Sequence, residues 1–299
     1  MRTASSVSRA GGEGFGKLGS GMATGSASST SSAATEGGDR APIAVILAAG
    51  KGTRMRSDLP KVLHEVGGRP MFCAVVDACR AAGCARVVLV VGYKQEAVRR
   101  AVEGQGPRWA QGIEFAVQGE QLGTGHAVLA AKGALSGHVQ PGRACFVLAG
   151  DGPLIRAQTL GALLDRHAGA KAAATLATAQ IEDPTGYGRI VRDGAGRFAG
   201  IVEEREASQA QRGIREVNPS YYCFELAALL DGLGRVRRNP GSGEYYITDV
   251  PALLLAEGRR VEVLAAVPAE DVLSINTPEQ LAQVDAIYRA RAARPGGSA

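Results

Sequence analysis

"ILAAGKGTRMRSDLPK" (residues 46–61) joins an apolar run to a loop that is rich in glycine and positive charge. The apolar run is short and is stopped by glycine, which is the pattern of a buried strand. Gly50 and Gly52 follow it, and glycines let backbone N–H groups turn toward an anion and allow its close approach. Before apolar character resumes, the segment carries four cations: Lys51, Arg54, Arg56 and Lys61. The segment therefore predicts a strand that leads directly into an anion-binding loop.

The same alternation of strand and helix continues along the chain. Apolar runs typical of buried strands begin at residue 43 and recur at 86–92, 113–118, 144–151 and 172–179. Segments with helical spacing lie between and after them, at 71–83, 95–104, 125–135 and 157–169. Continuous apolar strands that alternate with helices indicate the α/β class. We expect a Rossmann-like, mainly parallel sheet that is covered by helices on both faces.

Beyond Gln180 the rhythm changes. Residues 188–204 form two short strand patterns around a glycine-containing turn, which is a hairpin signal. A further strand is expected at 217–226, a helix at 247–258, a strand at 261–267 and a closing helix at 277–294. We interpret residues 41–299 as one domain with a small second lobe, at about 181–250, that bears the hairpin. Residues 1–40 are a Ser/Gly-rich mixture with too little apolar surface to fold, so we predict a disordered tail.

Composition excludes several classes of partner. Of the formal charge of +5, residues 1–40 supply +1 and the end from Val284 supplies +2, so the middle retains +2 and has no long basic run. Aromatic residues make up only 5% of the chain, which argues against a base-stacking platform. We therefore expect no nucleic-acid partner. No apolar run reaches the roughly 18–20 residues that span a bilayer, so membrane insertion is not expected.

The cysteines predict a reducing compartment. Five are present, an odd number, and none forms a CxxC pair: Cys73, Cys79, Cys84, Cys145 and Cys223. Most lie in apolar segments, which favours buried thiols in a cytoplasmic protein over a disulfide framework.

Two familiar phosphate-binding motifs do not fit the loop. The P-loop pattern needs a Lys-Ser/Thr pair that GKGTRM does not supply, and the dinucleotide pattern needs glycine at Met55. The longer string "LAAGKGTRM…LPK" instead resembles the signature of the nucleoside-triphosphate:sugar-1-phosphate nucleotidylyltransferases. The match continues, in unbroken order, with "VQGEQLGTGHA" (117–127), "DPTGYGRIV" (183–191), "GIVEE" (200–204), "EVN" (216–218) and "GEYYITD" (243–249). Within that family, residues 43–290 are similar to uridylyltransferase domains that make UDP-N-acetylglucosamine.

The resemblance implies that UTP and a sugar-1-phosphate are the substrates and that Mg²⁺ is the cofactor. It implies catalytic roles for Arg54, which faces the pyrophosphate, and for Lys61, which contacts phosphate. The metal is expected on Asp151, at the end of a strand, and on Asn276, since one carboxylate and one amide oxygen suit Mg²⁺. Lys51 and Arg56 are expected to be solvated. Nucleotidyl transfer needs positioned charge more than covalent help, which agrees with the absence of a nucleophilic triad around these motifs.

The resemblance also implies which residues contact the two substrates. Uracil recognition falls to Gln118, whose amide can both donate and accept, and to Gly123 and Thr124. His126 is expected only to pack at a helix start. The sugar and its acetamido group are assigned to three residues of the second lobe: Gly188, Glu203 and Asn218. The remaining substrate contacts are assigned to two strand ends: Leu47, Ala48, Ala49, Gly50, Ala149 and Gly150.

Some features depart from the family pattern. Ala149 precedes the Gly-Asp pair where a Tyr or similar residue is frequent, and Pro219–Ser220 follow Asn218 where Ser or Thr and Gly are usual. Both lie near the expected sugar site. Bifunctional relatives continue into a hexapeptide-repeat β-helix that transfers acetyl groups, and nothing here resembles that repeat. We therefore infer neither acetyl transfer nor the family's trimer.

Other functions stay open. A related enzyme could use another sugar-1-phosphate, in which case it would differ at the three lobe residues, or could transfer a cytidylyl group to a molybdenum cofactor, which usually lacks "GYGRI" and "EYYITD". A glycosyltransferase would need an Asp-x-Asp motif, but Gly152–Pro153 follow Asp151. A non-catalytic nucleotide-sugar-binding protein would not need the full phosphate and metal set.

Overall fold

A computed structural model of the chain describes residues 40–293. The predicted disordered tail therefore lies outside the described residues, apart from Arg40. Within the described part, a central seven-stranded sheet has the strand order β13-β7-β12-β6-β1-β4-β5. Its strands are β1 (Ile43–Ala48), β4 (Arg86–Val91), β5 (Ile113–Val117), β6 (Ala144–Ala149), β7 (Ala174–Ala177), β12 (Tyr221–Glu225) and β13 (Val261–Leu264).

The sheet is mainly parallel, as expected. β6, β1, β4 and β5 run parallel to one another, and β13 runs parallel to β7. β12 is the exception, because it lies antiparallel between β6 and β7. β1, β4 and β6 are almost wholly buried, which explains why each appears in the sequence as an apolar run, whereas β5 and β13, at the two ends of the strand order, are only partly buried.

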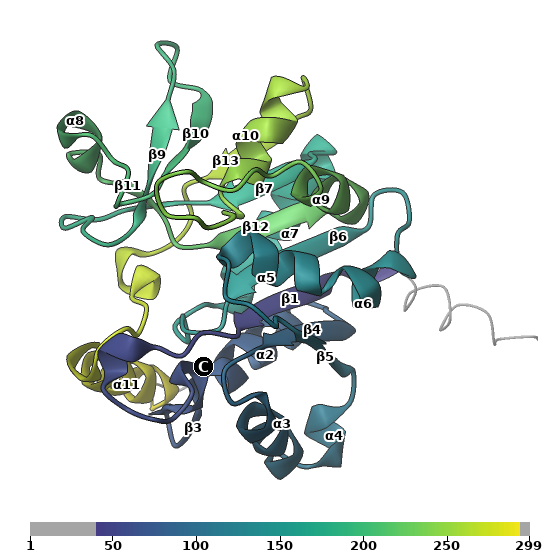
Figure 1. The fold of residues 1–299 in the computed structure, drawn as a ribbon, viewed down its shortest axis with the longest axis vertical. Coiled ribbons are helices and arrows are strands. Elements are labelled where there is room, and N and C mark those ends of the chain that lie inside the picture. The colour runs from purple at the N-terminus through teal and green to yellow at the C-terminus, as the bar shows by residue number, and fades with distance from the viewer. Residues whose placement is uncertain (1–39, 294–299) are drawn as a thin grey trace, which may run out of the picture.

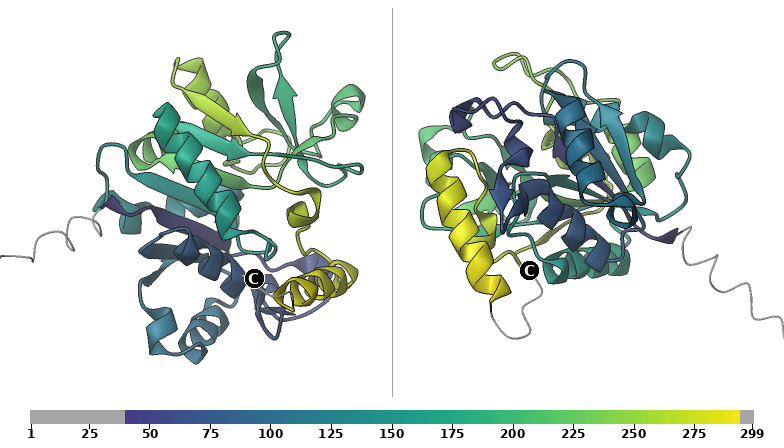
Figure 2. Two further views of the ribbon diagram at one scale, coloured as in Figure 1. Left: turned by 180° about the vertical axis from the view of Figure 1, so that it is seen from behind. Right: turned by 90° about the horizontal axis from the view of Figure 1, so that it is seen from below.

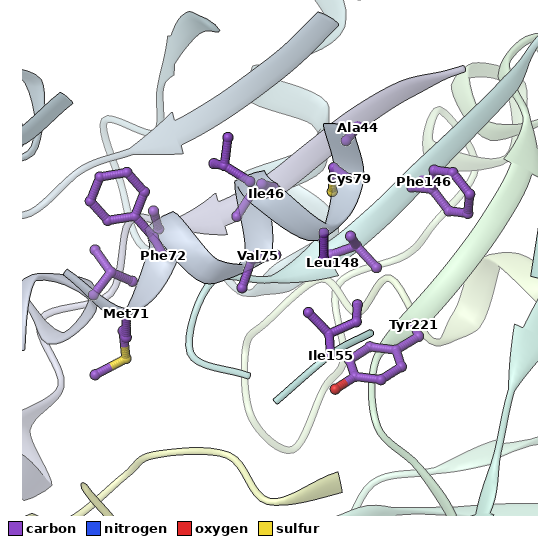
Figure 3. Packing of buried hydrophobic residues seen from close by; sticks show 14 of the residues in the cluster. Ala44, Ile46, Met71, Phe72, Val75, Cys79, Phe146, Leu148, Ile155 and Tyr221 are labelled. Carbon is purple, nitrogen blue, oxygen red and sulfur yellow. The ribbon is translucent and has the colours of Figure 1, made fainter. Parts of the chain in front are cut away.

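Helices cover both faces of the sheet, which confirms the predicted fold class (Figure 1). On one face, Ile46 of β1 belongs to a core cluster with α2 (Met71–Ala81) and α7 (Ala157–Ala170). On the other face, Val45 belongs to a cluster with α5 (Thr124–Ala130), α9 (Leu226–Leu233) and α10 (Asp249–Ala256). Neighbouring residues of one strand thus face opposite layers, as the pleat requires. Figure 3 shows Val75 and Cys79 of α2 beside Ile46 in the first cluster.

A second, antiparallel sheet carries the predicted hairpin. Its order is β10-β9-β11-β8, formed by β8 (Ala179–Gln180), β9 (Gly188–Arg192), β10 (Phe198–Val202) and β11 (Glu216–Asn218). At the hairpin turn, Asp193 N–H donates to Arg197 O at 2.8 Å. The proposed boundaries of the domain and of its lobe stay predictions.

The single strand predicted at 217–226 is wrong. The chain instead forms β11 in the second sheet and β12 in the first, and α9 then begins at Leu226. The break falls at Pro219, which cannot donate to a ladder, and at Ser220, whose φ is +64°. One apolar segment therefore crosses between the two sheets.

The remaining elements surround these layers. They are η1 (Thr53–Met55), η2 (Lys61–Leu63), β2 (Glu65–Val66), β3 (Arg69–Pro70), α3 (Gln95–Gly104), α4 (Pro107–Ala110), α6 (Lys132–Ser136), α8 (Gln209–Arg212), η3 (Ala269–Val272) and α11 (Pro278–Ala292). In the two further views, α11 lies beside the segment that follows β1 (Figure 2). There Gly67 N–H donates to Asp285 Oδ1 at 2.7 Å.

Two further findings concern the chain as a whole. Among residues 40–293, no helix has both the length and the apolar character that a membrane crossing requires. All five cysteines are buried free thiols, as the sequence predicted.

Candidate active site

A cavity of about 310 Å³ lies at the carboxyl ends of β1 and β6. Ligands of open α/β sheets bind at such strand ends, and the volume falls within the range of small-molecule sites. Ten residues predicted from the sequence line the cavity: Leu47, Ala48, Ala49, Gly50, Lys61, Gln118, Gly123, Thr124, Ala149 and Asp151. Segments from three separate strand–loop units therefore meet around one space.

The predicted anion-binding loop, residues 49–61 (the phosphate loop), takes its shape from Gly52. This residue has φ +71° and ψ 54°, a left-handed conformation that glycine adopts without steric cost. A Cβ built on Gly52 would lie 2.6 Å from Lys61 Cβ and 3.0 Å from Lys61 Cγ. The loop thus folds back on itself so that Lys61, nine positions later, enters the cavity wall. From the sequence, Gly52 is expected to let the loop approach an anion, but no substrate contact is assigned to it.

Lys61, Asp151 and Asn276 form one charge cluster. Lys61 Nζ contacts Asp151 Oδ2, and it donates to Asn276 Oδ1 at 2.7 Å. Arg54 donates from a guanidinium nitrogen to the same Asn276 oxygen at 2.8 Å. The side chains of Lys61 and Asp151 are 14% and 22% exposed, so water only partly screens their charges. The structure thus gathers both predicted catalytic cations and both predicted metal ligands, which are far apart in the chain.

Hydrogen bonds of neighbouring backbone and side-chain groups fix the segments that carry Asp151 and Asn276. Ile275 N–H donates to Asp151 O at 3.0 Å, which ties the end of β6 to the segment before α11. Asn276 N–H donates to Gln280 Oε1 at 2.8 Å, and the Asn276 amide donates to Ser274 Oγ at 3.2 Å. These contacts aim Asn276 Oδ1 toward Lys61.

The cluster fits a divalent cation of the Mg²⁺ type. Among residues 40–293, no three His, Cys, Asp or Glu side chains converge to hold a metal ion. Mg²⁺, however, usually takes one or two protein oxygens and completes its shell with water and substrate phosphates. Asp151 and Asn276 each direct a hard oxygen at one positive nitrogen, and that ammonium shows that a cation can bridge the two oxygens.

Gln118 forms the opposite wall of the cavity. Its side chain is only 5% exposed, and its Nε2 donates to Gly123 O at 3.1 Å. The same nitrogen lies 3.2 Å from His126 Nδ1. Anchoring of Nε2 on both sides fixes the plane of the amide. His126 therefore does more than pack at the start of α5, because it helps to orient a wall residue.

Segment 243–249 supports this wall from behind. Tyr245 N–H donates to Leu122 O at 2.8 Å, and Gly125 N–H donates to Tyr245 O at 2.7 Å. A Cβ on Gly123, whose φ is +97°, would lie 2.6 Å from Tyr245 O. Two motifs that are about 120 positions apart in the sequence thus pack backbone against backbone, and only glycine permits this approach.

The three residues predicted for the sugar lie together on or next to the second sheet. Asn218 of β11 pairs with Gly188 of β9, and its amide donates to the Tyr222 hydroxyl at 2.6 Å. Glu203, directly after β10, accepts a hydrogen bond from Thr248 Oγ1 at 2.8 Å. Thr248 follows Ile247, whose N–H donates to Thr124 Oγ1 at 3.1 Å. This chain of contacts connects the sugar candidates to the cavity wall, although they are not among the residues that line the cavity itself.

The carboxyl group of Glu203 has an altered pKa. Burial raises the pKa above its ordinary value, and the nearby carboxylates of Glu206 and Asp249 raise it further. The hydrogen bond from Thr248 acts in the opposite direction by stabilising the charged form. A partly buried acid of this kind is suited to hydrogen bonding with polar groups of a ligand.

Several wall residues were not predicted. Gln121 lines the cavity, and its Nε2 donates to Ala49 O at 2.8 Å, so it links the segment that follows β5 to the end of β1. Its position inside the motif at 117–127 was a usable signal. Val62, Ala127 and Glu244 also line the cavity. Ala127 and Glu244 lie inside the motifs at 117–127 and 243–249, whereas Val62 directly follows Lys61. Gly150, a predicted residue outside the lining, donates its N–H to Leu47 O at 2.9 Å.

Comparisons with known proteins agree with this geometry. Residues 44–220 match the model of a family described as "MobA-like NTP transferase domain". The chain is 48% identical over 248 residues to the bifunctional protein GlmU of Pelotomaculum thermopropionicum, which covers 83% of this chain and 52% of that protein. It is 45% identical to the protein of the same name from Heliobacterium modesticaldum, over 84% of this chain and 53% of that protein. The chain thus spans about half the length of these relatives.

A solved structure shares the fold. It is a UDP-glucose pyrophosphorylase in complex with UDP-glucose, and it matches 83% of this chain and 98% of its own with a TM-score of 0.66. The sequence identity is 15%, so this likeness concerns the arrangement of strands and helices.

Proposed function

Because the chain belongs to the family of MobA-like NTP transferase domains, we propose that it makes UDP-N-acetylglucosamine and pyrophosphate from UTP and N-acetylglucosamine-1-phosphate. The resemblance stated from the sequence is confirmed at the level of the family and of the bifunctional relatives. The choice of uridine and of N-acetylglucosamine is our proposal. The product is a precursor for the cell envelope, and the five free thiols suit a cytoplasmic location.

One observation carries the proposal. The cluster of Lys61, Arg54, Asp151 and Asn276 stands at the edge of a cavity whose other wall is Gln118. Cations and hard oxygens on one side suit a triphosphate and its metal. On the other side, the Nε2 of Gln118 is engaged with Gly123 O and His126, which leaves its Oε1 to accept a hydrogen bond from the imide N–H of a uracil base.

The reaction requires little covalent help from the protein. A phosphate oxygen of the sugar-1-phosphate attacks the α-phosphorus of UTP, a new P–O bond forms, and the bond to the β-phosphate oxygen breaks. Pyrophosphate leaves with the bonding electron pair. The attacking phosphate is already ionised at neutral pH, so no general base is needed. The protein must position the two anions and stabilise the charge that gathers around the α-phosphorus.

The charged residues divide this task. Lys61, in the cavity wall, contacts phosphate oxygens. Arg54 hydrogen-bonds to Asn276 outside the cavity lining, and there it would contact the departing pyrophosphate. Asp151 and Asn276 would hold Mg²⁺, which when bound neutralises phosphate charge. Holding these groups ready before the reaction is how an enzyme lowers a barrier of this type without reorganisation during the step.

The sugar is assigned to the second sheet. Glu203 and Asn218 offer acceptors and donors that are anchored by Thr248 and Tyr222. Little space surrounds Gly188, since a Cβ there would lie 3.0 Å from Ile201 Cγ2 and 3.7 Å from Asn218 Cβ. A polar, partly buried site of this kind penalises ligands that leave its groups unpaired. One alternative is a relative that uses another sugar-1-phosphate. Ala149 and Pro219 favour it, because both depart from the family pattern near the proposed sugar site.

Pyrophosphate release tests the proposal. The purified chain is incubated with Mg²⁺ and each of four nucleoside triphosphates in turn, together with N-acetylglucosamine-1-phosphate. Release is expected with UTP, and much less with CTP, ATP or GTP. Arg54→Ala should reduce this release strongly, whereas Arg108→Ala, which removes an exposed arginine of α4, should not. Absence of release with every nucleotide would overturn the enzymatic function, and a preference for another nucleotide would overturn the assignment of Gln118.

A further inference from the structure

The ammonium group of Lys61 uses the same two oxygens that are proposed for the metal. It contacts Asp151 Oδ2 and donates to Asn276 Oδ1 at 2.7 Å. Arg54 takes a further lone pair of the Asn276 oxygen, at 2.8 Å. In this structure, therefore, the side chains that would bind a divalent ion are already paired with a cation from their own chain.

A divalent ion and this ammonium exclude each other. Mg²⁺ binds oxygen at about 2.0–2.1 Å and demands near-octahedral geometry. An ammonium that is hydrogen-bonded to both oxygens occupies the region between them, and two positive charges a few ångströms apart repel each other strongly where solvent is partly excluded. From this arrangement we propose that Lys61 is a resident counter-ion of the metal site: it holds the place of the divalent ion until the nucleotide draws it away.

This inference rests on the proposed function, because it takes Asp151 and Asn276 as the metal ligands. It adds an order of events to that function. The triphosphate brings negative charge to the cavity wall that Lys61 lines. The ammonium then exchanges its two protein oxygens for phosphate oxygens, and Asp151 and Asn276 become available. Metal and nucleotide should thus bind together, and metal alone should bind weakly.

The packing of the lysine stem limits the movement that is needed. A Cβ on Gly52 would lie 2.6, 3.0 and 3.2 Å from Lys61 Cβ, Cγ and Cδ, so the glycine backbone packs against the lower stem. The end of the stem beyond Cδ can rotate, and a lysine ammonium is a compact point charge with three rotatable donors. A change at the outer torsions transfers the charge from carboxylate to phosphate without refolding of the loop. Gly52 therefore fixes where the lysine starts and leaves its tip adjustable.

Binding of Mn²⁺ to the substrate-free chain tests this inference. The free Mn²⁺ signal in electron paramagnetic resonance gives the dissociation constant for the wild type and for Lys61→Met. We expect Lys61→Met to bind Mn²⁺ at least tenfold more tightly, because the competing ammonium is gone. Lys51→Met removes the same charge from an exposed position of the same loop, and it should change the dissociation constant less than twofold.

A second variant identifies the site. Adding Asp151→Asn to Lys61→Met should abolish the gain in Mn²⁺ affinity. The inference is overturned if Lys61→Met binds Mn²⁺ no more tightly than the wild type, or if the gain survives in the double variant. Lys61→Gln, which keeps most of the stem, gives the same comparison should Lys61→Met unfold. No substrate is present, so the result is independent of whether the chain proves to transfer uridylyl groups.

Discussion

The position of the Lys61 side chain depends on a single glycine, Gly52, which packs against its stem. Because Gly52 adopts φ +71° and leaves no room for a Cβ against the lysine stem, any other residue there would be strained and would also displace the cation. At this scale the chemistry is set by a few contacts of well-defined geometry. Two predictions belong to individual residues.

The first concerns the metal ligands. Asp151→Asn and Asn276→Ala should each lower kcat by about 10²–10³-fold, since one preorganised electrostatic contact is typically worth about 3–4 kcal/mol in a transition state. Melting temperatures should change little, because Asp151 is partly exposed. Asp165→Asn, an exposed change on α7, is the control. Kinetics at saturating Mg²⁺ give the answer, and a near-normal kcat in both variants would refute the assignment.

The second concerns Glu203. Its folded pKa is raised by burial and by neighbouring carboxylates, so the folded state holds the proton more tightly than the unfolded state does. The free energy of unfolding therefore falls as the pH rises from the ordinary pKa of the group through its folded pKa. Glu203→Gln keeps an acceptor for Thr248 and cannot ionise, so its stability relative to the wild type should increase from pH 4 to pH 8.

Denaturant unfolding at both pH values measures this difference. Glu182→Gln, an exposed change in the same region, should show no such increase. A Glu203→Gln variant whose relative stability stays constant or declines between pH 4 and pH 8 would contradict the proposed effect of burial.

At the scale of elements, Asp271 connects three segments that flank the two proposed metal ligands, Asp151 and Asn276. It lies in η3, is only 1% exposed, and accepts hydrogen bonds from Arg156, in the segment that follows β6, and from Arg291 of α11. Arg291 also donates to Leu154 O at 3.1 Å. Asp151 precedes Arg156 by five positions and Asn276 follows Asp271 by five, so this ion pair braces the two ligand-bearing segments against each other.

Asp271→Asn should therefore affect metal binding as well as folding. Loss of a buried partner costs on the order of 3 kcal/mol, and the looser segments should raise the Mn²⁺ dissociation constant several-fold. Glu216→Gln is the matched control, since Glu216 is a buried carboxylate that pairs with Arg192 in the second sheet, away from the cluster. It should lose stability and leave the Mn²⁺ dissociation constant unchanged. Equal effects of both variants on metal binding would mean that Asp271 has only a general role in stability.

The elements also show which features a sequence can predict. β1, β4 and β6 are short apolar runs bounded by glycine or polar residues, so local pattern identifies them without tertiary information. The break before β12 falls at Pro219 and Ser220, but its antiparallel direction is seen only in its pairing with β6 and β7, which are distant in the chain. Arg54, Lys61 and Asp151 lie in recognisable motifs, whereas Asp271 belongs to none, and its importance appears only when α11 packs beside the strand ends.

At the scale of the whole molecule, the two sheets divide the proposed labour. The carboxyl ends of the seven-stranded sheet carry the phosphate loop, Asp151 and Gln118, and the second sheet carries Gly188, Asn218 and, just after β10, Glu203. Segment 243–249 bridges the two sheets. Its Ile247 contacts the cavity wall, and its Thr248 contacts Glu203. The proposed nucleotide and sugar sites are therefore built on different sheets and linked by one segment, so under this proposal the choice of sugar can change while the phosphate chemistry is retained.

A competition between two sugar-1-phosphates tests directly the claim that this chain prefers N-acetylglucosamine-1-phosphate. The purified chain receives UTP, Mg²⁺ and equal concentrations of N-acetylglucosamine-1-phosphate and glucose-1-phosphate, and the initial ratio of the two nucleotide-sugar products gives the ratio of kcat/KM. We expect UDP-N-acetylglucosamine to exceed UDP-glucose at least about tenfold, since each buried polar group left unpaired costs about 1–3 kcal/mol, and we expect Asn218→Ala to narrow the ratio. Equal amounts of the two products, or an excess of UDP-glucose, would contradict the claim.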